Sequence, residues 1–134
     1  MKIGVIGLGF VGLSLSSVLA SKGYNVVGID IDKDKCDKIS KGVSPFFEPG
    51  LEKVLLNGLK KKLVVKTDFS LINDCDMIFV TVGTPQKSNG SIELSMIKNA
   101  VSTIGKIIAK SKKNQILFIK STVTPGTLQN IILP

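Results

Sequence analysis

The sequence predicts an α/β fold, a doubly wound and mainly parallel sheet with helices on both faces. Short apolar runs typical of buried strands alternate along the 134 residues with stretches of helical periodicity. Polar loops follow several of these runs. A hydrophobic content of 43% and a mean hydropathy of +0.32 suit a sheet that is covered on both sides. We therefore expect one domain, residues 1–134, large enough to bury its own core.

The first thirty residues predict a strand, a glycine turn, a helix and a second strand in that order. The apolar run 3–6 meets a glycine at position 7, and 26–29 is a second run of the same kind. Gly23 stands where the intervening helix should stop. That helix is indicated by apolar residues at helical spacing, namely Val11, Leu15, Val18 and Leu19. The stretch therefore predicts a βαβ unit.

The glycines between strand and helix follow the pattern G-x-G-x-x-G, and each has a separate role. Gly7 allows the tight turn, Gly9 lets a pyrophosphate approach the backbone, and Gly12 lets the helix lie close to the sheet. The helix starting near Phe10 would direct its free N–H groups at the phosphates. Asp30 can bind both adenosine ribose hydroxyls and would repel the 2′-phosphate of NADP. This Rossmann-type pattern predicts an NAD site; the alternative is a tightly packed βαβ unit without a ligand.

The rest of the chain continues the alternation of elements. Asp32 suits the N-cap of a helix over 33–41, and Pro49 suits the first position of a second helix that Gly58 closes. Lys35 is either an ordinary surface lysine or a cation that faces the ribose. The other elements expected are a loop over 42–49 anchored by two phenylalanines, a helical turn over 67–74, a helix over 94–109, and strands over 63–65, 77–82 and 116–119. The expected inward-facing helix residues are Cys36 and Ile39, then Leu51, Val54 and Leu55, then Met96, Ile97, Val101, Ile104 and Ile108.

Three polar loops follow three of the predicted parallel strands. They cover residues 7–12, 83–86 and 121–127. Parallel connections bring the loops to one edge of the sheet, along one crevice. Any one of them alone would more often be a turn than a ligand site. Their convergence favours a binding site.

The amino-acid composition argues against three kinds of partner: nucleic acid, metal ions and membranes. The net charge is +8, but the chain has one tyrosine and no tryptophan, so we interpret the lysines as solvated faces and expect no nucleic-acid partner. Cys36 and Cys75 lack metal-ligand spacing and the chain has no histidine, so no metal site is expected. Both cysteines are interpreted as small buried hydrophobes. No run reaches membrane-spanning length and the start does not resemble a signal peptide, so a cytoplasmic protein without a membrane partner is expected.

Four segments of the chain carry a further signal, namely KIGVIGLGFVGLSL with Asp30, then Glu48-Pro49-Gly50-Leu51, then Val82-Gly83-Thr84-Pro85, then Lys120-Ser121-Thr122-Val123 with Pro125-Gly126. Together they resemble the UDP-glucose/GDP-mannose dehydrogenase family, specifically its N-terminal NAD-binding domain. The likeness spans nearly the whole chain. The resemblance implies that NAD is held by Gly7, Gly9, Phe10, Val11, Gly12, Asp30, Lys35, Val82, Gly83, Thr84, Pro85, Gln86, Ser121 and Thr122. It also implies that Thr122 positions a catalytic water beside the nicotinamide; no chemistry is assigned to Glu48.

The resemblance further implies oxidation of the C6 alcohol of a nucleotide sugar to a carboxylate with two NAD. The family's nucleophilic cysteine, catalytic lysine and asparagine, and sugar pocket all lie beyond Pro134 of this chain. This chain alone is therefore expected to be inactive, with the substrate and any homodimer contact belonging to the missing part. Two alternatives stay open: a stand-alone NAD-sensing regulatory module, and an enzyme oxidising a β-hydroxyacid.

Overall fold

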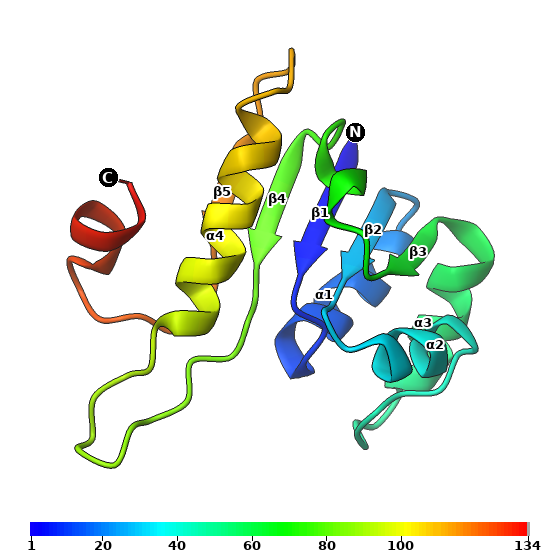
Figure 1. The fold of residues 1–134 in the computed structure, drawn as a ribbon. Coiled ribbons are helices and arrows are strands. Elements are labelled where there is room, and N and C mark those ends of the chain that lie inside the picture. The colour runs from blue at the N-terminus through cyan, green and yellow to red at the C-terminus, as the bar shows by residue number, and fades with distance from the viewer. Residues whose placement is uncertain (134) are drawn as a thin grey trace.

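The chain forms an open sheet whose strands all run in the same direction (Figure 1). The computed structural model describes residues 1–133, and Pro134 lies outside the described residues. The sheet has five strands in the order β3-β2-β1-β4-β5. The strands are β1 (Lys2–Ile6), β2 (Asn25–Ile29), β3 (Leu63–Lys66), β4 (Met77–Val80) and β5 (Ile116–Ile119). The predicted α/β fold with a parallel sheet is confirmed.

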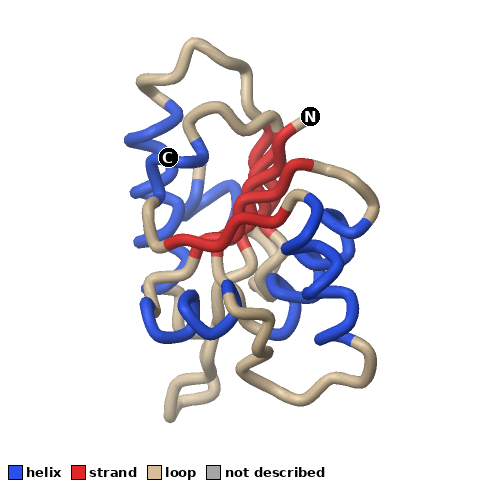
Figure 2. The backbone as a smooth tube through the Cα atoms, turned by 90° about the vertical axis from the view of Figure 1, so that its right-hand side faces the viewer, coloured by secondary structure: helices blue, strands red, loops and turns tan. Residues whose placement is uncertain are grey.

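Helices lie on both sides of the sheet, as Figure 2 shows with the sheet seen nearly edge-on. They are α1 (Phe10–Ser21), α2 (Lys33–Ser40), α3 (Leu51–Lys61) and α4 (Ser95–Ile108), with the short helices η1 (Phe69–Ile72) and η2 (Leu128–Ile132). In the strands, alternate residues face opposite sides. Thus Val26 belongs to the core under α1 and α3, and Val27 to the core under α4. Among residues 1–133, no helix combines the length and apolarity needed to cross a bilayer.

Helix α1 is present as predicted, but its buried face is not the one its large apolar residues indicated. Val11 and Val18 are 51% and 46% exposed, and Leu15 and Leu19 are partly buried. The buried side consists instead of Leu13 and four small residues, namely Gly12, Ser16, Ser17 and Ala20. Small side chains let the helix axis approach the sheet and its neighbour α3 more closely than branched ones would.

Helix α3 corrects two expectations from the sequence. It begins at Leu51 after Gly50, which has a φ of +83°, so Pro49 precedes the helix and is not its first residue. Gly58 does not end the helix, because α3 continues to Lys61. Gly58 is buried at the contact with α1, where an added Cβ would lie 3.1 Å from the Ser17 carbonyl oxygen and 3.2 Å from the Ala20 Cβ. This glycine therefore serves close helix packing.

Helices α2 and α4 follow the predicted pattern with one exception. Asp32 caps α2, its carboxylate accepting the Lys35 amide hydrogen at 2.9 Å, and Cys36 and Ile39 are buried. In α4 the fully buried residues are Ile97, Ala100 and Ile104. Met96, expected inside, is 43% exposed because it lies at the start of α4 beside the cleft described below.

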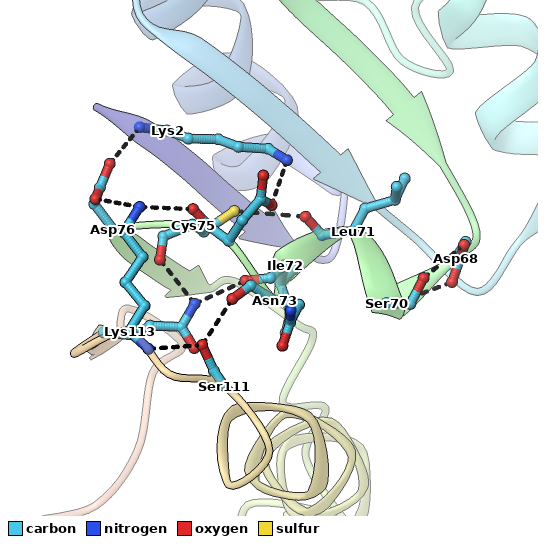
Figure 3. A network of polar contacts seen from close by, with 12 residues as sticks. Lys2, Asp68, Ser70, Leu71, Ile72, Asn73, Cys75, Asp76, Ser111 and Lys113 are labelled. Carbon is cyan, nitrogen blue, oxygen red and sulfur yellow. Dashed lines mark hydrogen bonds and ion pairs between the residues drawn. The ribbon is translucent and has the colours of Figure 1, made fainter.

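The amino ends of β1, β4 and β5 are held together by an ionic cluster (Figure 3). Lys2 pairs with Asp74 at 2.6 Å, and Lys113 pairs with Asp76 at 2.7 Å. The Lys2 backbone amide also donates to Asp76. Hydrogen bonds from Lys2 and Lys113 hold the pKa values of Asp74 and Asp76, respectively, below their ordinary range. The cluster joins three strands at the end remote from the cleft.

The close contact at Gly58 generates a stability prediction. Gly58→Val should lower the free energy of unfolding by about 1–3 kcal/mol, because its Cβ meets the α1 backbone. The matched control is Gly105→Val in α4, where an added Cβ would meet no atom within 4 Å. That variant should stay within about 0.5 kcal/mol of wild type in urea unfolding followed by circular dichroism. Equal destabilisation by the two variants would contradict the packing role of Gly58.

Candidate functional site

The carboxyl ends of the strands open onto a cleft of about 790 Å³. In Figure 1 the chain leaves the arrowheads of β1 and β4 in opposite directions, toward α1 on one side and toward α4 on the other. This divergence is the topological switch point, where open α/β sheets bind their ligands. The residues lining the cleft are Ile6, Gly7, Gly9, Phe10, Val11, Ile29, Asp30, Ile31, Asp32, Lys35, Phe69, Thr81, Val82, Gly83, Thr84, Met96, Asn99, Ala100, Thr103, Lys120, Ser121 and Thr122.

The glycine turn between β1 and α1 is closely packed at two of its glycines and open at the third. Gly7 has a φ of +93°, and an added Cβ would lie 2.9 Å from the Val82 Cα. A Cβ on Gly12 would lie only 1.8 Å from the Gly7 carbonyl oxygen. Gly9, in contrast, has open space where its Cβ would be. The backbone of the turn is therefore open to the cleft at Gly9.

The N-terminus of α1, the positive end of the helix dipole, lies at this open part of the turn. Gly9 is the N-cap of α1 and has no side chain to accept a hydrogen bond, and the first turn of the helix carries no acidic residue. Its first N–H groups are therefore free for an external acceptor, and the helix dipole adds to the attraction of an anion. A backbone that lies open at Gly9 beside these N–H groups fits a pyrophosphate.

Asp30 lies at the end of β2 and is only 7% exposed. Its Oδ2 accepts a hydrogen bond from the Leu8 backbone amide at 2.8 Å and pairs with the Lys35 Nζ at 3.0 Å. Its Oδ1 accepts from the Asp32 backbone amide at 3.0 Å. The carboxylate is therefore fixed in orientation at the cleft, with an ammonium group beside it.

The loop after β4 divides into a part that lines the cleft and a part that leaves it. Val82, Gly83 and Thr84 line the cleft, but Pro85 and Gln86 do not. Gln86 forms an antiparallel bridge with Ile92, and its Nε2 donates to the Gly90 carbonyl at 3.0 Å. The structure thus places two of the expected cofactor residues in a local hairpin.

The loop after β5 closes the far side of the cleft. Ser121 and Thr122 both line it, as expected from the sequence. The Ser121 hydroxyl donates to the Val82 carbonyl at 2.7 Å, which ties this loop to the one after β4. Thr122 is exposed at the cleft.

Some cleft residues were not predicted. Asn99 and Thr103 line the cleft from α4, and Thr81 lines it from the end of β4. A signal for the first two exists in the sequence, because polar residues four apart share one helix face. Thr81 gives no such signal, since a β-branched residue at a strand end is ordinary.

The loop before α3 lies next to the glycine turn. Phe46 packs on Phe10 with ring centroids 4.0 Å apart, so one of the two expected aromatic anchors is in contact. Phe47 is 88% exposed and does not anchor the loop.

These features define a dinucleotide-binding domain: a parallel sheet with a glycine turn at its switch point and an acid at the end of β2. The family model for the UDP-glucose/GDP-mannose dehydrogenase family, NAD binding domain, matches residues 1–134. The chain belongs to this family. NAD is the cofactor of the domain, and the open Gly9 backbone and fixed Asp30 carboxylate fit it.

Two curated relatives and a solved structure that are similar to this chain are nucleotide-sugar dehydrogenases. GDP-mannose 6-dehydrogenase of Pseudomonas syringae pv. tomato is 40% identical over all of this chain and 31% of its own length. UDP-glucose 6-dehydrogenase AglM of Haloferax volcanii is 34% identical with the same coverage. A ternary complex of GDP-mannose dehydrogenase from Pseudomonas aeruginosa has a TM-score of 0.97 at 38% identity, over all of this chain and 31% of that one. The chain therefore spans about a third of the length of these relatives.

The turn geometry predicts opposite outcomes for two of its glycines. Gly12→Ala should cost at least about 3 kcal/mol of stability, because its methyl group would overlap the Gly7 carbonyl. Gly9→Ala should stay within about 0.5 kcal/mol of wild type, because its methyl group meets no atom. Thermal unfolding of the two variants checks this. A Gly12→Ala chain as stable as the Gly9→Ala chain would refute the geometry.

Proposed function

We propose that this chain is the NAD-binding domain of a nucleotide-sugar dehydrogenase that oxidises a C6 alcohol to a carboxylate with two NAD. The observation that carries the proposal is the convergence of three loops, after β1, β4 and β5, on one cleft beside the Asp30 carboxylate. The family and the relatives named above support the same conclusion.

The proposed placement of NAD follows the polarity of the cleft. The pyrophosphate would lie on the N-terminus of α1, over Gly9, Phe10 and Val11. The adenosine ribose would lie on Asp30, with Lys35 beside it. Gly7 and Gly12 would shape the turn, and Gly7 also lines the cleft.

The nicotinamide end of the cofactor would lie between the loops after β4 and β5. Val82, Gly83 and Thr84 line this part of the cleft from one loop, and Ser121 and Thr122 from the other. NAD bound there supplies a hydride acceptor. The exposed Thr122 hydroxyl is the group we assign to positioning a water. Pro85 and Gln86 follow in the adjoining hairpin, and their assignment to the cofactor rests on the family resemblance.

The nucleophile of the reaction must come from outside this chain. Cys36 and Cys75 are both buried, and burial raises the pKa of both thiols, that of Cys75 to about 11. A catalytic cysteine needs a lowered pKa and access to the substrate. Because the chain spans 31% of the length of its relatives, we assign the nucleotide-sugar site and any contact of a homodimer to a further segment. By itself the chain would bind NAD without oxidising a sugar.

Cofactor choice tests the placement at Asp30. The chain should bind NAD at least about tenfold more tightly than NADP, because the carboxylate repels a 2′-phosphate. Asp30→Ala should weaken NAD binding about tenfold and reduce this preference, since the ribose loses its acceptor. Calorimetric titration of both nucleotides measures the affinities. The charge-matched control is Asp34→Ala, an exposed residue in the first turn of α2 and outside the cleft lining. Equal affinity of wild type for NAD and NADP would refute the assignment.

The size of the native polypeptide tests whether this domain is part of a longer dehydrogenase. An antibody raised against this domain should detect a band about three times heavier than 14.3 kDa in source cells, because the chain spans 31% of its relatives. A band at 14.3 kDa would contradict the dehydrogenase and favour a stand-alone NAD-sensing module.

A further inference from the structure

The residue that follows β4, Thr81, makes contacts that the proposed function does not use. It is 8% exposed, and its hydroxyl oxygen lies 2.7 Å from the Gly7 carbonyl and 3.0 Å from the Ile6 carbonyl. The Ile6 carbonyl already accepts the Thr81 backbone amide at 2.8 Å. A hydroxyl has one proton to donate. The shorter contact, to the Gly7 carbonyl, is therefore the hydrogen bond we assign to it.

This bond acts on a peptide group that is also held from its other side. The carbonyl of the Gly7–Leu8 peptide accepts from Thr81, and its N–H, on Leu8, donates to Asp30 Oδ2 at 2.8 Å. The two partners come from the ends of different strands, β4 and β2. Gly7 has a φ of +93° and no Cβ, so its own side chain does nothing to fix the orientation of this peptide.

The space for the bond exists because of Gly12. An added Cβ at that position would lie 1.8 Å from the Gly7 carbonyl oxygen and 2.5 Å from the Thr81 hydroxyl. The helix therefore lies directly against this hydrogen bond. A rotated Gly7–Leu8 peptide would take the carbonyl away from Thr81 and the N–H away from Asp30 together.

We propose that Thr81 is a positioning residue for NAD binding, whose hydroxyl fixes the Gly7–Leu8 peptide and, through it, the Asp30 carboxylate. The inference rests on the proposed function, because the carboxylate is taken to bind the adenosine ribose. Although Thr81 lines the cleft, its hydroxyl proton is committed to the turn, so its effect on NAD binding would pass through the Gly7–Leu8 peptide to Asp30.

The test compares Thr81→Val, which keeps the shape and removes the hydroxyl, with Thr81→Ser, which keeps the hydroxyl. Calorimetric titration of the 134-residue chain should give NAD binding about five- to tenfold weaker for Thr81→Val and near wild type for Thr81→Ser. The control is Ser17→Ala, which removes a buried hydroxyl that has no hydrogen bond within residues 1–133 and lies on the α3 side of α1. It should bind NAD as wild type does.

Amide hydrogen exchange separates positioning from general stability. In Thr81→Val the Leu8 amide should lose protection, while the amides inside β1, such as that of Val5, keep theirs. Weakened binding with a uniform loss of protection would mean a structural role and overturn the proposal. So would unchanged NAD binding by Thr81→Val, or weakened binding by Thr81→Ser equal to that of Thr81→Val. A wild-type chain that binds no NAD would instead overturn the proposed function, and this inference with it.

Discussion

The approach of α1 to the sheet is the constraint on which most of this structure depends. The Gly12 backbone lies so close to the Gly7 carbonyl that no side chain fits between them. Small side chains also occupy the rest of the buried side of α1, at Ser16, Ser17 and Ala20. Gly58 of α3 then packs on the backbone of Ser17. Helices α1 and α3 thus pack against each other over the same face of the sheet, with little side-chain volume between them. A wider spacing would move the N-terminus of α1 away from the end of β1 and from the cleft.

The amino ends of the strands carry the ion pairs that stabilise the sheet, and the carboxyl ends carry the groups available for binding. At the edge where β1, β4 and β5 begin, Asp74 and Asp76 are neutralised by lysines, and their lowered pKa values show that the charged forms are favoured there. At the carboxyl edge the free N–H groups of α1 have no acidic partner in their first turn, and the oriented Asp30 carboxylate lines the cleft. Polar groups that a ligand must meet are therefore kept at one edge, while the ion pairs that hold the strands are at the other.

The sequence could predict those features that depend on local chemistry. A positive φ at Gly7, an open backbone at Gly9 and the cap at Asp32 are each encoded within a few residues, and the structure has all three. Features set by distant packing could not be predicted in the same way. Val11 and Val18 are exposed although hydropathy favours burying them, because the inner face of α1 is selected by close approach and not by apolar area. Gly58 has the residue type of a helix end, but its contact with α1 explains why a glycine stands inside the helix. The hairpin that removes Gln86 from the cleft depends on its pairing with Ile92, which no short motif specifies.

The position of Thr81 shows why the missed residue matters more than its ordinary type suggests. Parallel pairing of β1 with both β2 and β4 brings the ends of three strands together. Asp30 and Thr81 then hold opposite sides of the same peptide, one as acceptor and the other as donor. The Thr81 bond alone contributes about 1 kcal/mol, and the bond to the charged Asp30 carboxylate about 1.5–3 kcal/mol. Together they determine the orientation of a glycine peptide that has no side chain of its own to determine it. The glycine freedom that permits the tight turn therefore requires restraint from neighbouring strands, and the register of the sheet supplies it.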